Sequence, residues 1–420
     1  MHTVEITEEA TEWGETVRRE LKEVILVLSS SRGGSSVFTE YLRHSNALLH
    51  MRGEINPWLN KCGLSYPNSG TGSDALGEEE LFGKSEALWT WLGSEIGNMS
   101  TTSQAWNQFP NQLHRRLQLQ WPEKSLDTNT INTAVKTVLG RWPSFKSQIG
   151  LCPERFHLAL IRQLQNMGLT HIRPHWYDIA DDSLFEWGWD PSQLGEIPSL
   201  IEEPPLVLIT PWKRPSINDL RSKPLVIKTP SNAYRIPFLR AFFSNQKLRI
   251  IHLKREPAAA INGLYDGWRY PRGFHAHRIP SCQPKTCEEH GPQPVSGYWK
   301  YDLPPGWKEV EKNLLVEICA FQWLSSHKHI LESDTGDGKP LGIWFENLLG
   351  PNSRNEINRL LNWLDINADE HLRHKVLEDL PPIMATQRPR RSRWFSRAAL
   401  IQPQLERNEI QDVWRQLKHG

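Results

Sequence analysis

The amino-acid sequence predicts an α/β protein: three layers, helix, sheet, helix, around a central parallel sheet, with a mostly helical insertion. Two observations predict this class. First, short apolar runs typical of buried strands alternate with segments of helical periodicity, which is the pattern of parallel strands joined by helical crossovers. Second, helical patterns replace this alternation between residues 76 and 205. The 420 residues, 38% of them hydrophobic, suffice for one large domain or two ordinary ones.

The first part of the sheet is expected near the N-terminus, with a strand at 24–28 and a helix at 35–43. After the insertion, strands are expected at 206–210, 224–228, 248–253 and 341–345. Helices are expected at 232–243, 257–267, 308–328 and 354–364. The predicted division of the chain is 1–75, 76–205 and 206–420, with helices at 129–139 and 153–167 inside the middle part.

Composition excludes several classes of protein. The net charge is +1, so bulk charge predicts no attraction to nucleic acid or membrane. Five cysteines, an odd number and a sparse set for this length, argue against a disulfide framework and favour a reducing compartment. No apolar run approaches the ~20 residues of a membrane span, and the acidic start with Glu5, Glu8 and Glu9 is unlike a signal peptide. We therefore expect a cytoplasmic protein; the sequence does not predict its oligomeric state.

The segment VILVLSSSRGGSSVF at 24–38 has the composition of an anion-binding turn. Glycines let backbone N–H groups face an anion, the helix N-terminus adds partial positive charge, and serine hydroxyls can donate to phosphate oxygens. Arg32 adds a fixed cation. A solvated turn with an ordinary serine N-cap remains the alternative. The pattern G-x-x-x-x-G-K-[ST] of nucleoside-triphosphate sites is absent, because no lysine follows Gly34, and this disfavours ATP and GTP chemistry.

The stretch SRGGSS resembles the 5′-phosphosulfate loop of sulfotransferases that use 3′-phosphoadenosine 5′-phosphosulfate (PAPS), a family with a P-loop-like fold. The resemblance implies that Arg32 contacts the bridging or sulfuryl oxygens. It also implies that Gly34, Ser35 and Ser36 hold the 5′-phosphate. Gly33 stands where the family usually has serine or threonine.

A second stretch, LRIIHLKREPAAAINGLYDGW at 248–268, resembles the 3′-phosphate element of the same family. By this resemblance Arg255, at the strand end, holds the 3′-phosphate. The family's serine eight residues later aligns with Gly263, and only Asn262 beside it offers a polar side chain. A surface pair of Arg255 and Glu256 at a helix start is the alternative.

Other segments resemble bacterial members of that family, and together the likeness covers the first ~65 residues and about 220–400. These segments are KTPSNAYRIPFLRAFF (228–243), LPPGW (303–307) and IWFENLL (343–349). RPRRSRWF at 388–395 resembles the basic loop that closes over the nucleotide. Its candidate phosphate ligands are Arg388, Arg390, Arg391 and Arg393.

The implied activity is sulfuryl transfer from PAPS to a hydroxyl or amine, leaving 3′,5′-adenosine bisphosphate. Cations must stabilise charge on the transferred group, for which Arg32 and Lys228 are the candidates. The general base is sought in LLHMRGEINPW at 48–58, which resembles the segment carrying the base in related bacterial enzymes. Glu54 is the first candidate and His50 the second.

Four questions about the site and its function stay open in the sequence. Asp266 is a third candidate base, and Glu54 could instead pair with Arg52 or another cation. The acceptor could be a small molecule, a glycan or a lipid. Nine of the 19 tryptophans lie between Trp89 and Trp212, where they could form an acceptor platform or pack in a core. A small-molecule kinase and a non-catalytic nucleotide-binding relative are the competing functions.

The resemblance implies no metal, but the loop at 270–305 contains possible ligands. They are His275, His277, Cys282, Cys287 and His290. Structural zinc sites usually have tighter cysteine pairs than the C-x4-C found here. We therefore expect an ordered loop beside the acceptor pocket and no metal site.

Overall fold

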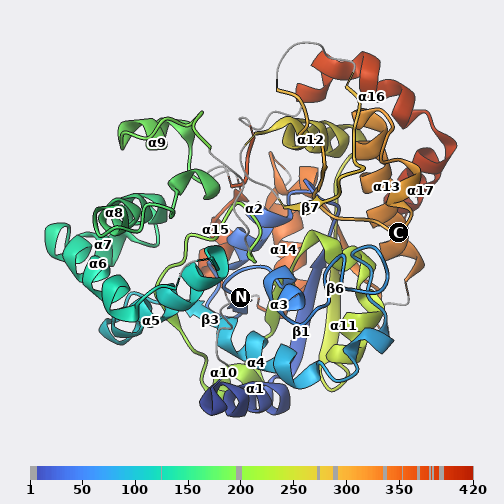
Figure 1. Ribbon diagram of the computed structural model, residues 1–420. Coiled ribbons are helices and arrows are strands. Elements are labelled where there is room, and N and C mark those ends of the chain that lie inside the picture. Colours follow the sequence, from blue (N-terminus) through green and yellow to red (C-terminus); the bar gives the residue numbers. More distant parts are fainter. Residues whose placement is uncertain are drawn as a thin grey trace.

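The computed structural model describes residues 7–419 apart from a few short segments, and its ribbon is drawn in Figure 1. The segments left out are 124, 195–200, 272–274, 287–291, 334–337, 352, 367–368, 378–379, 381–382 and 387–391. No helix among the described residues is long and apolar enough to cross a membrane.

The strands of the described residues form one large sheet and one hairpin. They are β1 (Glu23–Leu28), β2 (Leu49–Met51), β3 (Ile96–Met99), β4 (Trp212–Lys213), β5 (Leu225–Lys228), β6 (Lys247–Lys254), β7 (Ala276–Arg278), β8 (Tyr298–Lys300) and β9 (Leu341–Trp344). The large sheet has the order β4-β3-β2-β5-β1-β6-β9, and β7 pairs with β8.

The helices before β5 are α1 (Glu8–Glu20), α2 (Ser35–Leu42), α3 (Asn56–Lys61), α4 (Ser85–Glu95), α5 (Ser103–Gln120), α6 (Thr128–Arg141), α7 (Phe145–Gln148), α8 (Pro153–Asn166), α9 (Asp181–Glu186) and α10 (Ile217–Ser222). Those after it are α11 (Ile236–Phe242), α12 (Pro257–Arg269), α13 (Leu315–Glu332), α14 (Ser353–Trp363), α15 (Glu370–His374), α16 (Ala398–Leu405) and α17 (Asn408–His419).

The centre of the sheet is β1, which pairs in parallel with β5 on one side and with β6 on the other. β2 and β9 continue the parallel sheet outward. At one edge β3 and β4 add to it in antiparallel fashion. The predicted P-loop-like α/β fold with a central parallel sheet is confirmed, and the two antiparallel edge strands were not expected.

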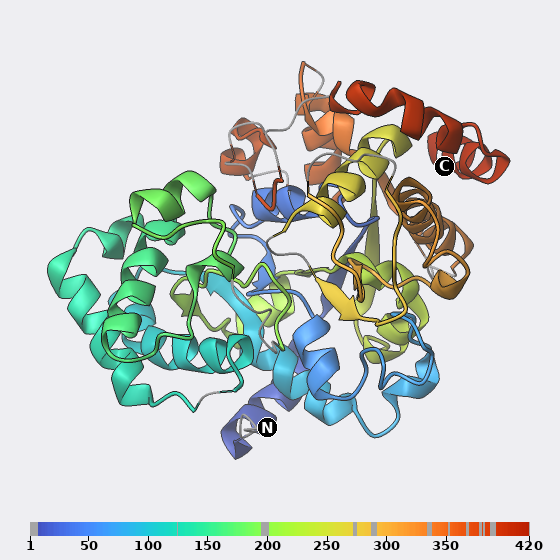
Figure 2. The ribbon, with the colours of Figure 1, turned by 45° about the horizontal axis from the view of Figure 1, so that its top comes forward.

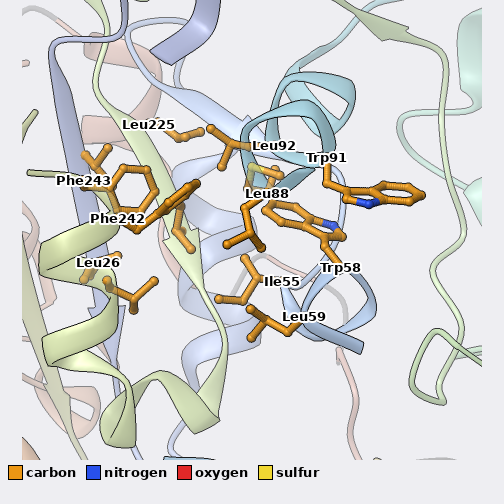
Figure 3. Packing of buried hydrophobic residues seen from close by; sticks show 14 of the residues in the cluster. Leu26, Ile55, Trp58, Leu59, Leu88, Trp91, Leu92, Leu225, Phe242 and Phe243 are labelled. Atoms are coloured by element: carbon orange, nitrogen blue, oxygen red, sulfur yellow. The ribbon is translucent and has the colours of Figure 1, made fainter. Parts of the chain in front are cut away.

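Alternate residues of β1 supply two cores, one on each face of the sheet. Leu26 packs with α1, α3, α4 and α11, where Trp58, Leu88 and Phe242 are buried (Figure 3). Val27 faces the opposite way and packs with α2 and α14. This alternation of a strand buried on both faces produces the three-layer arrangement.

Helices α5 to α9 form a group with its own hydrophobic core beside the sheet (Figures 1 and 2). Six of the nine tryptophans between Trp89 and Trp212 are buried and the other three are partly buried, so these side chains mainly pack inside the protein. Buried ion pairs link the group to β2 and α4, since Glu95 faces both Arg52 and Arg116, and Arg116 also faces Glu202. The division at 76 and 205 remains a prediction.

On the other side of the sheet, α12, α13, α16 and α17 share a further core with the β7–β8 hairpin (Figure 2). The loop expected at 270–305 therefore includes a short two-stranded sheet. Lys254, the last residue of β6, donates to the Leu417 carbonyl 2.7 Å away near the end of α17, where the partial negative charge of a helix C-terminus favours a cation.

Three predicted elements were wrong in position. The helix expected at 232–243 begins at Ile236, after the 3-10 helix η3 (Pro230–Tyr234). The strand expected at 206–210 is only a single bridge between Leu206 and Tyr177, because Leu206 and Ile209 are buried in the core of the helical group. The helix expected from residue 308 begins at Leu315, where the Glu317 carboxylate accepts a hydrogen bond from the Leu314 N–H 3.2 Å away and so sets the start.

Candidate active site

The candidate residues gather at the carboxyl ends of the parallel strands. The chain leaves β1 for β2 on one side of the sheet and later crosses from β5 to β6 on the other, so β1 lies where the connections reverse. Ligands of open α/β sheets bind outside the strand ends at such a reversal. The loop after β1, Lys228 at the end of β5, and Arg255 just after β6 all lie at this edge.

The loop after β1 makes a tight turn into α2. Arg32 and Gly34 have φ of 60° and 90°, in the left-handed region that favours glycine. A Cβ at Gly34 would also collide with the Phe345 ring, and one at Gly33 would collide with Ser29 and the Ser30 carbonyl. Both glycines are therefore required by the close approach of other groups, and a simple solvated turn would not need them.

The two predicted phosphate elements contact each other directly. Arg255 Nη1 donates to the Arg32 carbonyl across 223 residues of sequence. Gly263, on α12, lies against both, because a Cβ added at this glycine would be 3.4 Å from Arg32 Cβ and 3.8 Å from Arg255 Nη1. A larger side chain at this position would enter the space between the two arginines.

The guanidinium of Arg32 is held by a segment near the C-terminus. Arg32 Nη1 donates to the Met384 carbonyl, and Nη2 lies 3.4 Å from Thr386 Oγ1. Met384 is itself in the left-handed region, with φ of 53°. These contacts bring residues 352 positions apart to the same strand end.

Positive charge is concentrated around Arg255. Burial lowers the pKa of Arg255 to about 10, the Glu346 carboxylate opposes this shift, and the neighbouring cations Arg32 and Arg393 add to it. The Arg255 Nε and Glu346 Oε1 are 4.0 Å apart. Burial in turn raises the pKa of Glu346. An anion placed here would relieve the repulsion among the arginines.

Four buried polar atoms at this edge have no hydrogen-bond partner among the residues that the structure describes. They are Arg255 Nε, the hydroxyl oxygens of Ser30 and Ser31, and Glu346 Oε2. Buried polar groups are almost always satisfied, so the orphaned state of the three donors among them, together with the crowded cations, fits a site for phosphate oxygens.

Lys228 joins the loop to the first candidate base. Its Nζ pairs with Glu54 Oε1 and lies 3.3 Å from the Ser36 hydroxyl in the first turn of α2. The Lys228 side chain is 10% exposed and the Glu54 side chain 27% exposed. The structure thus brings together one cation, one carboxylate and one hydroxyl, and it leaves Glu54 open to solvent on one side. Glu54 pairs with Lys228, while Arg52 faces Glu95.

The other two candidate bases lie in different surroundings. His50 on β2 is 2% exposed, and burial, with a smaller effect from Arg43, lowers the pKa of its ring to about 3. Asp266 on α12 pairs with Arg393 and with Arg397, whose Nη1 is 2.7 Å from Asp266 Oδ1. The ion pairs of Asp266 thus connect it to Arg393 and Arg397 near the C-terminus, whereas Glu54 pairs with Lys228.

The C-terminal basic segment reaches α12 through the part of it that is described. Arg393 and Arg397 bound the 3-10 helix η7 (Arg393–Arg397), and Arg397 Nη1 also donates to the Asn262 side-chain oxygen at 2.9 Å. Asn262 therefore binds Arg397. Arg388, Arg390 and Arg391 lie outside the described residues.

Sequence reasoning missed several neighbours of the candidate residues. Phe345 and Glu346 fall in the IWFENLL stretch, which was noted only as a likeness, and Met384 and Thr386 lie in a segment without a motif. Apart from that stretch, nothing local in the sequence marks them. In the loop considered for zinc, Cys282 is fully buried in the core of the C-terminal helices, and Cys287 and His290 lie outside the described residues.

No family model and no curated protein matches this chain. Among solved structures, the chain is similar to a sulfotransferase domain from the Synechococcus PCC 7002 olefin synthase, with 12% sequence identity and a TM-score of 0.38. The match covers 95% of this chain and 96% of that chain.

Proposed function

We propose that this chain is a sulfotransferase that moves a sulfuryl group from PAPS to a hydroxyl or amine of an acceptor. One observation carries the proposal: the strand-end loop of Arg32 and the strand-end Arg255 meet at one edge of the sheet. Two separate cationic elements in contact suit a nucleotide with phosphates on both its 5′ and its 3′ side. A single phosphate group would need only one of them.

When bound, PAPS supplies the sulfuryl group and a phosphate that leaves with the nucleotide. The backbone of the turn after β1, with Ser35 and Ser36 at the start of α2, would orient the 5′ side. Arg255 would hold the 3′-phosphate, and Gly263 leaves room beside it. The Arg32 guanidinium would stabilise charge that develops on the transferred group.

The acceptor side is assigned to Lys228 and Glu54. Glu54 would accept the proton of the acceptor hydroxyl or amine as the transfer proceeds, because its carboxylate lies beside the turn and is partly open to solvent. Lys228, between Glu54 and Ser36, would hold that carboxylate in position beside the turn and place a fixed positive charge at the reacting centre.

The proposal is tested by calorimetric titration of the purified protein with 3′,5′-adenosine bisphosphate, AMP and ATP in the absence of metal. We expect the bisphosphate to bind at least tenfold more tightly than AMP, since an added charge-assisted contact contributes about 1.5–3 kcal/mol. Tight binding must be followed by sulfated product when PAPS is mixed with a panel of hydroxyl and amine acceptors.

Any of three results would reject this function. Equal affinity for the bisphosphate and AMP would remove the 3′-phosphate assignment. Preference for ATP with Mg²⁺, together with phosphorylated product, would instead identify a kinase. Bisphosphate binding without product on any acceptor would support a nucleotide-binding relative that has no transferase activity.

A further inference from the structure

Three side chains of types that can bind metals converge where the start of the β7–β8 hairpin meets the segment between α3 and α4. The ligand atoms of Asp74, His275 and His277 all lie within 4.8 Å of one another, and no other group of this kind occurs in the described part of the chain. His275 Nε2 and His277 Nε2 are 3.0 Å apart, and His277 Nε2 is 3.5 Å from Asp74 Oδ1. Asp74 and His277 are buried and His275 is partly buried.

These separations suit a shared metal ion. Zinc bonds to histidine nitrogen and carboxylate oxygen are ~2.0–2.2 Å long, and tetrahedral ligand atoms around such an ion are therefore roughly 3.3–3.5 Å apart. The observed 3.0 and 3.5 Å lie close to this spacing. Two imidazole nitrogens and a carboxylate oxygen are ligands that suit borderline divalent metals such as zinc, and here these atoms lie within 4.8 Å of one another.

A second set of contacts fixes the orientation of these ligands. His275 Nδ1, on the other side of the ring from Nε2, lies 3.0 Å from Glu203 Oε1, which is the carboxylate–histidine pairing common behind metal ligands. Asp74 Oδ2 accepts hydrogen bonds from the Ser231 hydroxyl at 2.7 Å and the Leu303 N–H at 2.9 Å. Asp74 Oδ1 is thereby directed toward His277.

A purely ionic account explains the cluster less well. Arg235 Nη2 lies 3.5 Å from Asp74 Oδ1 and already supplies Asp74 with a positive charge. Placing two further imidazolium cations beside Arg235 would add repulsion between like charges. With neutral rings the two Nε2 atoms share one N–H···N hydrogen bond, and a metal ion would take the place of that proton and bind both nitrogens.

We propose that Asp74, His275 and His277 bind one divalent zinc ion, with Glu203 orienting His275 and the fourth position taken by water. The ligands come from the segment between α3 and α4, and from the β7 strand and the residue before it, so the ion would fasten the β7–β8 hairpin to that segment. This site is distinct from the cysteines of the same loop. It does not depend on the proposed transferase activity, because its test measures metal content only.

The test is elemental analysis of the full chain after saturation with Zn²⁺ and removal of loose metal by gel filtration. We expect one zinc per chain, and less than a tenth of that in His277→Ala and Asp74→Asn. Glu203→Gln should bind zinc roughly 10–100-fold more weakly. His327→Asn serves as the matched control, since His327 Nδ1 is 2.9 Å from His252 Nε2 in a second buried histidine pair, and it should keep its zinc.

A spectroscopic measurement on the unmodified protein covers the case in which the variants fail to fold. Cobalt substitution should give the strong visible absorption of a tetrahedral Co²⁺ site with nitrogen and oxygen ligands, and added Zn²⁺ should abolish it. Absence of both zinc and the cobalt spectrum in the unmodified chain would overturn the proposal. Full zinc content in His277→Ala would do the same, because the ion would then be bound elsewhere.

Discussion

The sharpest prediction concerns Arg255→Ala. In the protein this side chain has its Nε buried without a hydrogen-bond partner among the described residues and its Nη1 on the Arg32 carbonyl. Loss of a charge-assisted contact to the 3′-phosphate costs about 1.5–3 kcal/mol, or roughly 10- to 150-fold in the affinity for 3′,5′-adenosine bisphosphate. AMP lacks that phosphate, so the affinity for AMP should fall at most several-fold, through loss of the support that Arg255 gives the loop after β1.

Calorimetric titration of the variant with both nucleotides measures the two losses side by side. The matched control is Arg249→Ala, which removes an arginine from the opposite end of β6. That side chain pairs with Glu23 and lies over the Trp363 ring, far along the strand from the loop after β1. Its removal should leave both affinities within about twofold. Equal losses for bisphosphate and AMP in Arg255→Ala would refute the reasoning, because Arg255 would then act only through the loop.

Three further predictions follow from the site and the core. Glu54→Gln should lower the rate of sulfated product formation by ~10²–10⁴, with bisphosphate affinity nearly unchanged in titration; full turnover would exclude Glu54 as the base. Gly34→Ala should weaken binding of every adenine nucleotide and lower Tm by a few degrees in calorimetry, since the left-handed conformation costs ~1–2 kcal/mol and the new methyl meets Phe345. An unchanged Tm would contradict this, because the loop would then accommodate the added methyl group without strain. Burial lowers the pKa of His157 to about 4. Between pH ~6.5 and 4 this histidine is therefore protonated in the unfolded chain and neutral in the folded one. His157 should therefore contribute a loss of stability as pH drops from 6.5 to 4, by up to tenfold in the folding constant per unit. Other buried histidines with lowered pKa values, such as His50 and His327, add to the total slope, so His157→Gln should reduce this slope in urea unfolding without abolishing it.

The local part of the site could be predicted from sequence because its parts are contiguous. A buried strand, a glycine turn and a helix start lie within 24–38, and Arg255 directly follows a second strand. Parallel strands end at one edge, so the meeting of these elements follows from the fold class. Lys228 could be placed there for the same reason.

Contacts between distant segments could not be predicted in this way. Asp74, Glu203 and the two histidines at β7 are separated by long stretches, and no spacing rule connects them. The antiparallel strand β4 consists of two residues only, which is too short to give a periodic pattern. The strand expected at 206–210 failed because apolar residues of a short segment fit a helical core as well as a sheet.

The position of β1 also governs how this chain can assemble during synthesis. β1 is made first, ends at Leu28 and is apolar on both faces, yet its nearest neighbours begin at Leu225 and Lys247. At ~5–20 residues per second the ribosome needs roughly 10–40 s to produce β5. Throughout that interval β1 is an unpaired, strongly apolar strand without its neighbours. Aggregation therefore competes most with folding during synthesis of the residues before 225.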